Sequence, residues 1–196
     1  MGKLVVSEFV TLDGVMEDPG GAEGFEHGGW AFRFERGAEG DRFKLDELLA
    51  ADALLLGRRT YEGFAEAWPS RSDEAGFADK MNSMPKFVVS TTLERADWSN
   101  STLIREDVAA EVAKLKQRPG GDVLVAGSGT LVQTLMRHDL VDEYRLMVFP
   151  VVLGSGRRLF EDGGEPRSLE VVETRPSGSV VLLTLRRARE GEVGTA

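Results

Sequence analysis

The sequence contains no cysteine and only two histidines. Without cysteine, the chain can form neither a disulfide framework nor a thiolate metal site. His27 and His138 lie far apart in the sequence and lack the spacing of metal ligands. The composition therefore argues against a disulfide-stabilised domain and against a zinc or iron enzyme, and we expect no bound metal.

Long hydrophobic runs are also missing. The first six residues contain no apolar signal-like region, and no later segment reaches the length needed to cross a bilayer. Lys and Arg total 24 against 33 Asp and Glu, which gives a formal net charge of −9. This charge repels nucleic acid and anionic lipid, so a bound anion must be held by a local cluster of donors. We expect a cytoplasmic protein that binds neither nucleic acid nor membranes.

The remaining composition is ordinary for one globular domain. A chain of 196 residues with 41% hydrophobic and 29% charged residues can bury a single core of useful size. No internal repeat and no linker divides it. We therefore predict one domain over residues 1–187, followed by a disordered tail over residues 188–196.

Strand-like and helix-like segments alternate through the first two-thirds of the chain. Apolar, β-branched runs predict strands, and apolar residues recurring every three or four positions predict helices. The predicted strands are residues 3–10, 53–56, 86–91, 102–105 and 122–126. The predicted helices are residues 41–51, 58–67 and 73–82, a helix capped by Asp107, and one that follows Gly129. This alternation indicates a largely parallel sheet with helices on its faces.

The pattern changes in the last third of the chain. Residues 143–152 predict a long strand, and residues 169–174 and 179–187 predict an antiparallel hairpin that turns at Pro176, Ser177 and Gly178. The sequence thus predicts a three-layer α-β-α fold, whose mostly parallel sheet ends in antiparallel C-terminal strands. Residues 17–40 are rich in glycine and follow no period, which predicts a long loop of the kind that often serves as a lid or a binding loop.

Three predicted strands end in glycine or hydroxyl residues that open a helix or a loop. These residues are Gly57, Arg58, Arg59 and Thr60; Ser90 and Thr91; and Gly127, Ser128, Gly129, Thr130 and Leu131. Ligands of open α/β sheets bind beyond the carboxyl ends of the strands. There, N–H groups at helix starts donate hydrogen bonds to phosphate, and glycine lets the backbone approach it closely. The two arginines add guanidinium groups suited to phosphate. Each cluster alone is explained by a turn, a cap or a solvated helix face, but together they predict a phosphate-binding site.

Neither glycine turn matches a common nucleotide motif. After Gly127 and Gly129 the third glycine of a Rossmann fingerprint is missing, because Leu131 and Val132 follow. No Gly-Lys-Ser/Thr follows either turn, so a P-loop is absent as well. The sequence requires a dinucleotide site of another kind.

In their order along the chain, these clusters resemble the dihydrofolate reductase-like fold. The resemblance is to the bacterial branch related to the C-terminal reductase domain of riboflavin biosynthesis, and it covers residues 3–187. It is carried by the segments TLDG at 11–14, LLGRRTYE at 55–62, GSGTL at 127–131, LVDEY at 140–144 and PVVLGSG at 150–156 with Leu159 and Phe160. It implies a homodimer that binds NADPH.

The resemblance also assigns parts of the cofactor to residues of this chain. The glycine, the two arginines and the threonine at 57–60 would hold phosphates, with Arg58 near the adenosine 2′-phosphate, which Ser90 and Thr91 would also face. Residues 127–131 would lie under the pyrophosphate and beside the nicotinamide. Two cations and a hydroxyl pair favour the ligand with the additional phosphate, so we expect NADPH rather than NADH.

These assignments predict an NADPH-dependent reductase of a small pterin-like or pyrimidine heterocycle. Hydride would pass from the nicotinamide to a C=N or C=O carbon. Two alternatives stay open: an NADP(H)-binding protein without robust catalysis, with a signalling or structural role, and a structural dimerisation module. The riboflavin-pathway reductases carry an acid just before the glycines of the third turn, and Ala126 stands there instead. This departure argues against the same substrate.

Three further residues are candidates for the chemistry. By the resemblance, the proton donor lies on the helix after the long loop, where Asp41 is the nearest match; a helix N-cap also explains this residue. Asp13 either contacts substrate or forms a tight turn with Gly14. Trp30 either forms an aromatic wall over the substrate or packs in the core. Asp41 is therefore the predicted catalytic residue, and Asp13 and Trp30 are the predicted substrate contacts.

Overall fold

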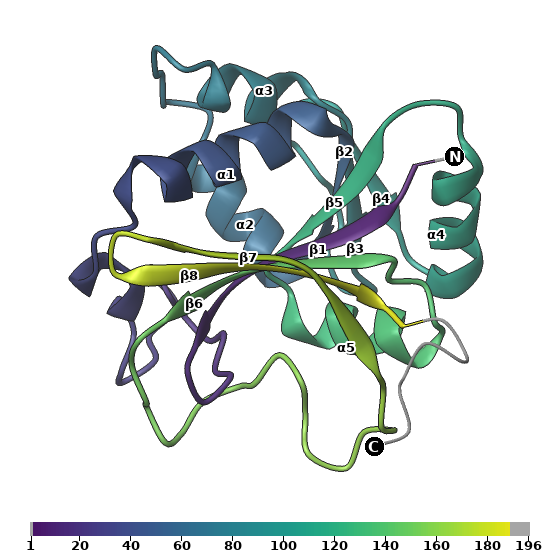
Figure 1. The fold of residues 1–196 in the computed structure, drawn as a ribbon. Coiled ribbons are helices and arrows are strands. Elements are labelled where there is room, and N and C mark those ends of the chain that lie inside the picture. The colour runs from purple at the N-terminus through teal and green to yellow at the C-terminus, as the bar shows by residue number, and fades with distance from the viewer. Residues whose placement is uncertain (1, 189–196) are drawn as a thin grey trace.

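The computed structural model describes residues 2–188, which form one eight-stranded sheet with helices on both faces (Figure 1). The strand order is β4-β3-β2-β5-β1-β6-β8-β7. The strands are β1 (Leu4–Thr11), β2 (Ala51–Gly57), β3 (Lys86–Val89), β4 (Ser101–Ile104), β5 (Asp122–Ala126), β6 (Glu143–Phe149), β7 (Leu169–Ser177) and β8 (Val180–Arg187). The helices are the 3-10 helix η1 (Trp30–Arg33), α1 (Gly37–Ala50), α2 (Arg58–Ala67), α3 (Phe77–Ser83), α4 (Val108–Gln117) and α5 (Gly129–Arg137).

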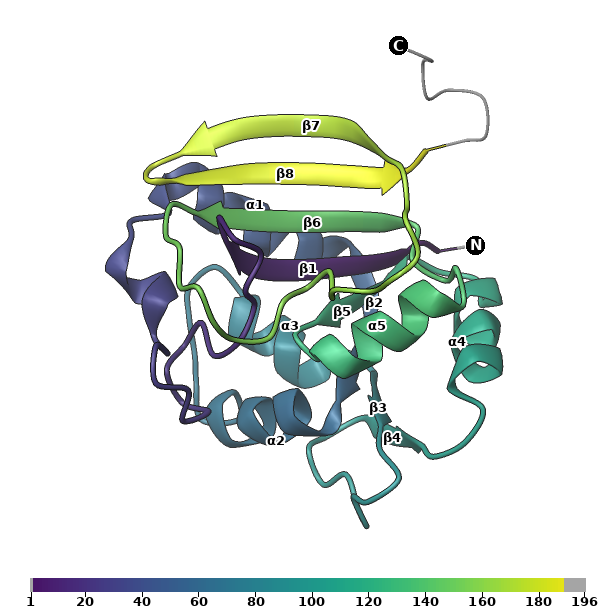
Figure 2. The ribbon, with the colours of Figure 1, turned by 90° about the horizontal axis from the view of Figure 1, so that it is seen from below.

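The sheet is parallel from β4 to β6 and antiparallel beyond it. Every neighbouring pair from β4 to β6 in the sheet order is parallel, whereas β8 is antiparallel to both β6 and β7. Figure 2 shows this last hairpin beside β6, at the end of the sheet opposite β4. The predicted fold class is confirmed. Because the strands before it are parallel, the carboxyl ends of β1, β2, β3 and β5 meet at one edge.

Two layers of side chains pack the sheet against its helices. In β2, Leu55 joins a core cluster with α4 and α5, whereas Leu54 and Leu56 join a cluster with α1, α2 and α3. All three leucines are fully buried. The continuous apolar run therefore packs on both faces, as expected for a strand inside a three-layer fold.

A third, smaller cluster lies under the C-terminal hairpin. It joins Trp30 and Ala31 of η1 to Phe149 of β6 and Leu182 of β8. The ring of Trp30 meets that of Phe149 edge-on, with the centroids 5.2 Å apart. The long loop is thus anchored to the sheet midway along its length, and the expectation of a loop without regular structure over residues 17–40 is wrong at η1 and at the start of α1.

Several predicted boundaries also differ. Asp107 precedes α4 but does not cap it with its side chain, because its backbone is left-handed, with φ 47°. Strand β6 ends at Phe149, since the N–H of Val151 turns back to the carbonyl of Phe149. Strand β7 continues through Pro176, which an edge strand tolerates because the missing N–H would face outward.

The tail predicted at residues 188–196 lies outside the described residues, apart from Ala188, which donates its N–H to the carbonyl of Ser168. Over the part of the chain that is described, none of the helices has the length and apolar character needed to span a bilayer.

Candidate functional site

The turns after β2 and β5 are in direct contact. Gly57 donates its N–H to Ser128 Oγ at 2.7 Å, and that hydroxyl donates to Thr60 Oγ1 at 3.0 Å. A Cβ atom on Gly127 would lie 2.8 Å from the same Thr60 oxygen. Since β2 and β5 are paired, their helices α2 and α5 begin at neighbouring points of the edge.

Replacing Gly127 with alanine should lower the free energy of unfolding by about 1–3 kcal/mol. Gly127 has φ +61°, where an added Cβ costs about 1–2 kcal/mol, and the β-branched Thr60 cannot easily give way. Urea unfolding measures the effect. Gly63→Ala is the control, because an added Cβ at this position in α2 meets nothing within 4 Å. That variant should gain about 0.5–1 kcal/mol; equal losses in both variants would contradict the packing of the two turns.

The turn that holds Ser90 and Thr91, after β3, lies beside the turn after β2. β3 pairs with β2, with Val89 opposite Gly57, so Ser90 follows at the same edge. The buried hydroxyl of Ser90 accepts the N–H groups of Thr92, at 3.2 Å, and Leu93, at 2.9 Å. Ser90 therefore stabilises its own turn, whereas the side chain of Thr91 is exposed.

Helices α2 and α5 both begin here without a side-chain cap. The N-cap residues are Gly57 for α2 and Ser128 for α5. Within the described residues, neither has a side chain that accepts a hydrogen bond from the first turn of its helix. The first N–H groups of each helix consequently lack an intrahelical acceptor, and they carry the positive end of the helix dipole. Two such helix starts side by side form a donor set for an anion.

Two arginines stand at the start of α2. Arg58 Nη1 lies 3.5 Å from Glu62 Oε1, and both side chains are about half exposed. An exposed pair of this kind contributes little, so it could be exchanged for a phosphate contact. The exposed Arg59 lies close enough to the long loop to influence Glu23 in that loop. Burial and the negative charge of Asp18 raise the pKa of the Glu23 carboxyl, and the positive charge of Arg59 opposes that rise.

The long loop is fixed beside these turns by hydrogen bonds to the carboxylates of Asp18 and Glu17. Asp18 is 2% exposed and accepts the N–H groups of Glu23, at 3.1 Å, and Phe25, at 3.2 Å. Glu17 accepts the N–H of Arg157 at 2.8 Å. A Cβ atom added to Gly129 would lie only 2.8 Å from the Cδ atom of Arg157, so the Arg157 side chain packs against Gly129. The loop and the segment around Arg157 thus reach the start of α5.

One buried acid in this region was missed by the sequence analysis. Glu8 of β1 is 5% exposed, and burial raises the pKa of its carboxyl to about 8. The N–H of Gly127 faces this carboxyl and partly opposes the rise. The signal was present in the sequence, because an acid inside the apolar run 3–10 stands out from its neighbours. The pattern of the run as a whole predicts only a strand.

A second polar cluster lies on the α1 side of the same strand. Ser7 donates to Glu47 Oε1 at 2.5 Å, and Lys44 donates to Ser7 Oγ at 2.5 Å and pairs with Glu47. The ammonium of Lys44 also lies 5.1 Å from the centre of the Phe9 ring. These side chains place charge between α1 and the sheet, where an apolar stripe is usual.

Trp30 does not form an aromatic wall over the site. Its side chain is fully buried in the cluster under the hairpin, and its Nε1 donates to the carbonyl of Glu17 at 2.8 Å. The core-packing alternative is correct, because no face of the ring is open to a ligand.

The interpretation of Asp41 as a helix N-cap is also wrong. Helix α1 begins four residues earlier, at Gly37, so Asp41 lies within it. Its carboxylate is 64% exposed and pairs with Arg36 at 2.8 Å. An exposed acid held by a neighbouring cation is a surface ion pair, which gives no support to the predicted catalytic role.

Asp13 bonds to the backbone of a distant segment. Its carboxylate accepts the hydroxyl of Thr11 at 2.6 Å and the N–H groups of Leu153, at 3.3 Å, and Gly154, at 2.8 Å. The Thr11 hydroxyl is the largest cause that lowers the pKa of this carboxyl. These contacts give Asp13 a structural role, while the predicted substrate contact stays a prediction.

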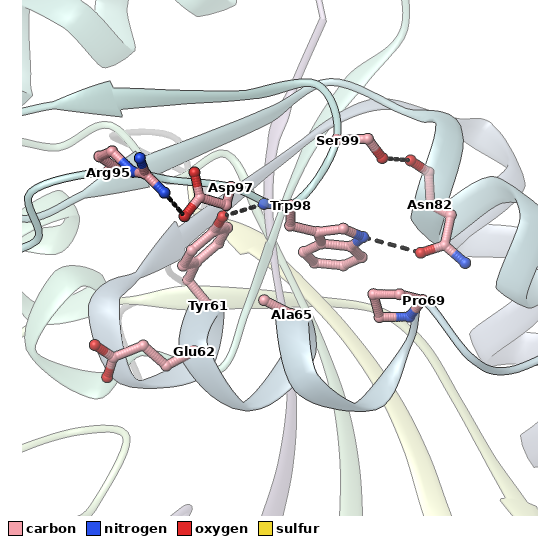
Figure 3. Close-up of a pocket in the computed structure, with 9 residues that line it drawn as sticks. All are labelled: Tyr61, Glu62, Ala65, Pro69, Asn82, Arg95, Asp97, Trp98 and Ser99. Atoms are coloured by element: carbon pink, nitrogen blue, oxygen red, sulfur yellow. Dashed lines mark hydrogen bonds and ion pairs between the residues drawn. The ribbon is translucent and has the colours of Figure 1, made fainter.

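A groove of about 730 Å³ lies elsewhere, between α2 and the segment 95–99 (Figure 3). Figure 3 shows the Trp98 indole above Ala65 and Pro69, with its Nε1 bonded to Asn82 Oδ1 at 2.9 Å. The N–H of Trp98 donates to the Tyr61 hydroxyl at 2.9 Å. None of the three turns lines this groove, and much of its polar lining is bonded internally, so we place the candidate site at the turns instead.

Comparison with known proteins gives a consistent family. Residues 2–183 match the family model described as "RibD C-terminal domain". Two proteins of Bacillus subtilis (strain 168) are similar over almost their whole length. The uncharacterized protein YyaP is 31% identical over 183 residues, covering 92% of each chain. The uncharacterized protein YwjB is 32% identical over 186 residues, covering 95% of this chain and 98% of its own.

Solved structures share the fold. A putative riboflavin biosynthesis protein from Shewanella sp. PV-4 superposes with a TM-score of 0.75 at 23% identity, over 96% of this chain and all of the other. A diaminohydroxyphosphoribosylaminopyrimidine deaminase/5-amino-6-(5-phosphoribosylamino)uracil reductase from Thermotoga maritima superposes with a TM-score of 0.63 at 18% identity. This chain spans 57% of that longer protein.

Proposed function

Because this chain belongs to the RibD C-terminal domain family, we propose that it is an NADPH-dependent reductase of a small pterin-like or pyrimidine heterocycle. The observation that carries the proposal is the contact between the two glycine turns. Because of this contact, two helices without side-chain caps begin next to each other at the sheet edge. Two adjacent arginines stand at the same point. Such a donor set suits a dinucleotide that carries several phosphates.

The residues present fit NADPH by the chemistry of their donors. The N–H groups that open α5, from Gly129 to Leu131, would hold the pyrophosphate, and those of α2 would add to them. Arg58 and the exposed hydroxyl of Thr91 would face the 2′-phosphate. Ser128 and Thr60 bond to each other, so their part is to hold the two turns together. When bound, the nicotinamide supplies the hydride.

The substrate class rests on the family and on one structural neighbour. That neighbour is titled as a reductase of a uracil derivative, which is a pyrimidine. In the polar cluster of Ser7, Lys44 and Glu47, on the α1 side of β1, the buried Oε2 of Glu47 has no hydrogen-bond partner among the described residues and could bond to a ligand. Such an acceptor matches the donors along the edge of a pyrimidine or pterin ring.

The proposal is tested by binding and by turnover. NADPH should quench the tryptophan fluorescence of the protein, and its oxidation should be followed with dihydrofolate, a dihydropterin and 5-amino-6-(5-phosphoribosylamino)uracil as probes. Oxidation that depends on one of these probes supports the reductase. Binding without any turnover would favour the alternative, an NADP(H)-binding protein with a signalling or structural role. Absence of binding would leave the dimerisation module.

A homodimer is also proposed, through the C-terminal hairpin. Val171, Val172 and Val181 are 58%, 50% and 41% exposed, and in Figure 2 the described helices leave β7 and β8 uncovered on the side facing the viewer. Exposed apolar side chains on a sheet face are typical of an interface. The double substitution Val171→Lys and Val181→Lys should convert a dimer to a monomer in light scattering. Leu49→Lys, at a 48% exposed position of α1, is the control that should stay dimeric.

A further inference from the structure

Glu8 lies where β1 and β5 separate. The last paired residues of these strands are Ser7 and Ala126, so Glu8 and Gly127 are the next residues on each side. The N–H of Gly127 faces the Glu8 carboxyl. Since Gly127 also contacts Thr60, the acid lies beneath the contact between the two glycine turns.

The carboxyl of Glu8 has hydrogen-bonding capacity that the protein does not use. Among the described residues, its Oε1 has no hydrogen-bond partner, although the side chain is 5% exposed. Native proteins rarely leave such an atom unpaired without a ligand or a function. The geometry therefore points to a group that meets a partner only when the site is filled.

The surroundings of Glu8 favour its neutral, proton-bearing form. Burial is the largest influence and disfavours the charged carboxylate. The charged groups near enough to influence its pKa are Glu47 and Lys44 of α1 and Glu23 of the long loop. The two acids also favour protonation, and only Lys44 and the N–H of Gly127 oppose it.

We propose that Glu8 donates the proton that completes reduction of the substrate, a role that rests on the proposed function. In reduction of a C=N bond, bound NADPH would supply the hydride that forms the new C–H bond and would itself be oxidised to NADP⁺. The electron pair of the C=N π bond then takes the proton of Glu8, so an N–H bond forms as the O–H bond breaks. The carboxylate that remains is reprotonated from water after the product leaves.

Three other acids, Asp13, Glu47 and Asp41, are less suited to this role. Asp13 accepts three hydrogen bonds as a carboxylate, and Glu47 is paired with Lys44. Asp41 is exposed and paired with Arg36. Each of them is therefore engaged as an anion, whereas a proton donor must be neutral before the reaction.

The first test measures the protonation of Glu8 without substrate or cofactor. The folded-state pKa, about 8, lies above the ordinary value of 4.5, so the folded protein binds more protons than the unfolded chain between these values. Stability from this group is present below pH 4.5 and is lost as pH rises to 8. The Tm of the wild type should therefore fall relative to that of Glu8→Gln across this interval. Glu143→Gln, a buried acid of β6 paired with Lys3, should not remove the fall.

The second test measures turnover with the probe that the wild type reduces. Glu8→Gln should bind NADPH as the wild type does, by tryptophan quenching, and should lose about 10²–10⁴-fold in kcat, the usual contribution of a positioned acid. The wild-type kcat should fall above about pH 8, where the donor is deprotonated. Glu143→Gln should keep the wild-type rate and pH profile.

The outcomes separate the two proposals. A wild type that is active with a Glu8→Gln variant of equal kcat overturns the donor role and leaves the reductase standing, as does a Glu8→Gln variant that loses NADPH binding. A wild type that binds NADPH and reduces no probe overturns the proposed reductase, and the donor role with it. A Tm difference that does not change between pH 4.5 and 8 overturns the protonated state on which the role depends.

Discussion

NADPH should bind the Arg58→Ala variant about ten- to a hundredfold more weakly than the wild type. A charge-assisted hydrogen bond to a phosphate contributes about 1.5–3 kcal/mol, and each 1.4 kcal/mol is a factor of about ten in affinity. Arg58 stands at the first position of α2, and its only recorded ion pair among the described residues is the exposed one with Glu62. The affinity for NADH should hardly change, because NADH lacks the 2′-phosphate.

Titration of tryptophan quenching with each cofactor measures both affinities. The matched control is Arg42→Ala, which removes another exposed arginine with an i,i+4 partner, Asp46, from the surface of α1. This control should bind both cofactors as the wild type does. Equal losses of NADPH and NADH affinity in Arg58→Ala would show that Arg58 does not contact the 2′-phosphate.

Replacing Trp30 with alanine should lower the free energy of unfolding by about 3–5 kcal/mol, the usual cost of removing a large aromatic side chain from a core. The ring is fully buried against Phe149, and its N–H donates a hydrogen bond to the carbonyl of Glu17. Its removal leaves a cavity and takes the hydrogen-bond donor away from the carbonyl of Glu17. It also frees the long loop from its anchor on the sheet, so NADPH affinity should fall as well.

Urea unfolding with an unchanged m-value would report this loss as stability alone. Phe32→Ala is the matched control, because Phe32 lies in the same 3-10 helix and is 82% exposed. Its removal should change stability by less than about 0.5 kcal/mol. A similar small effect in Trp30→Ala would mean that the ring is not part of the core.

The sequence alone determined the fold class and most of the elements. Apolar runs such as Leu54 to Leu56 predict strands buried on both faces, and the structure places the run between two core clusters. These predictions succeed because the periodicity of burial is a local property, which a strand or a helix imposes on its own residues. The predicted ends of helices and strands are less accurate. Whether Asp107 caps α4 depends on its backbone conformation, and whether β7 continues through Pro176 depends on the position of that strand at the edge of the sheet.

Which residues share a site was decided only in part by the sequence. The three turns could be placed at one edge, because parallel strands end on the same side. Glu8, Gly127 and Thr60 come from three elements, and their proximity depends on β5 lying between β1 and β2. The order of the strands along the chain does not predict this order of the strands in the sheet.

The roles of the single acidic and aromatic side chains were decided by the tertiary structure. Residue type and position in the sequence favour Asp41 and Trp30 as site residues, yet one is exposed and the other fully buried. Glu8 has an ordinary residue type, and it is distinguished by its burial and by an Oε1 that has no hydrogen-bond partner among the described residues. The physical reason is that the protonation and accessibility of a carboxyl depend on the groups packed around it, which the fold brings from distant parts of the chain.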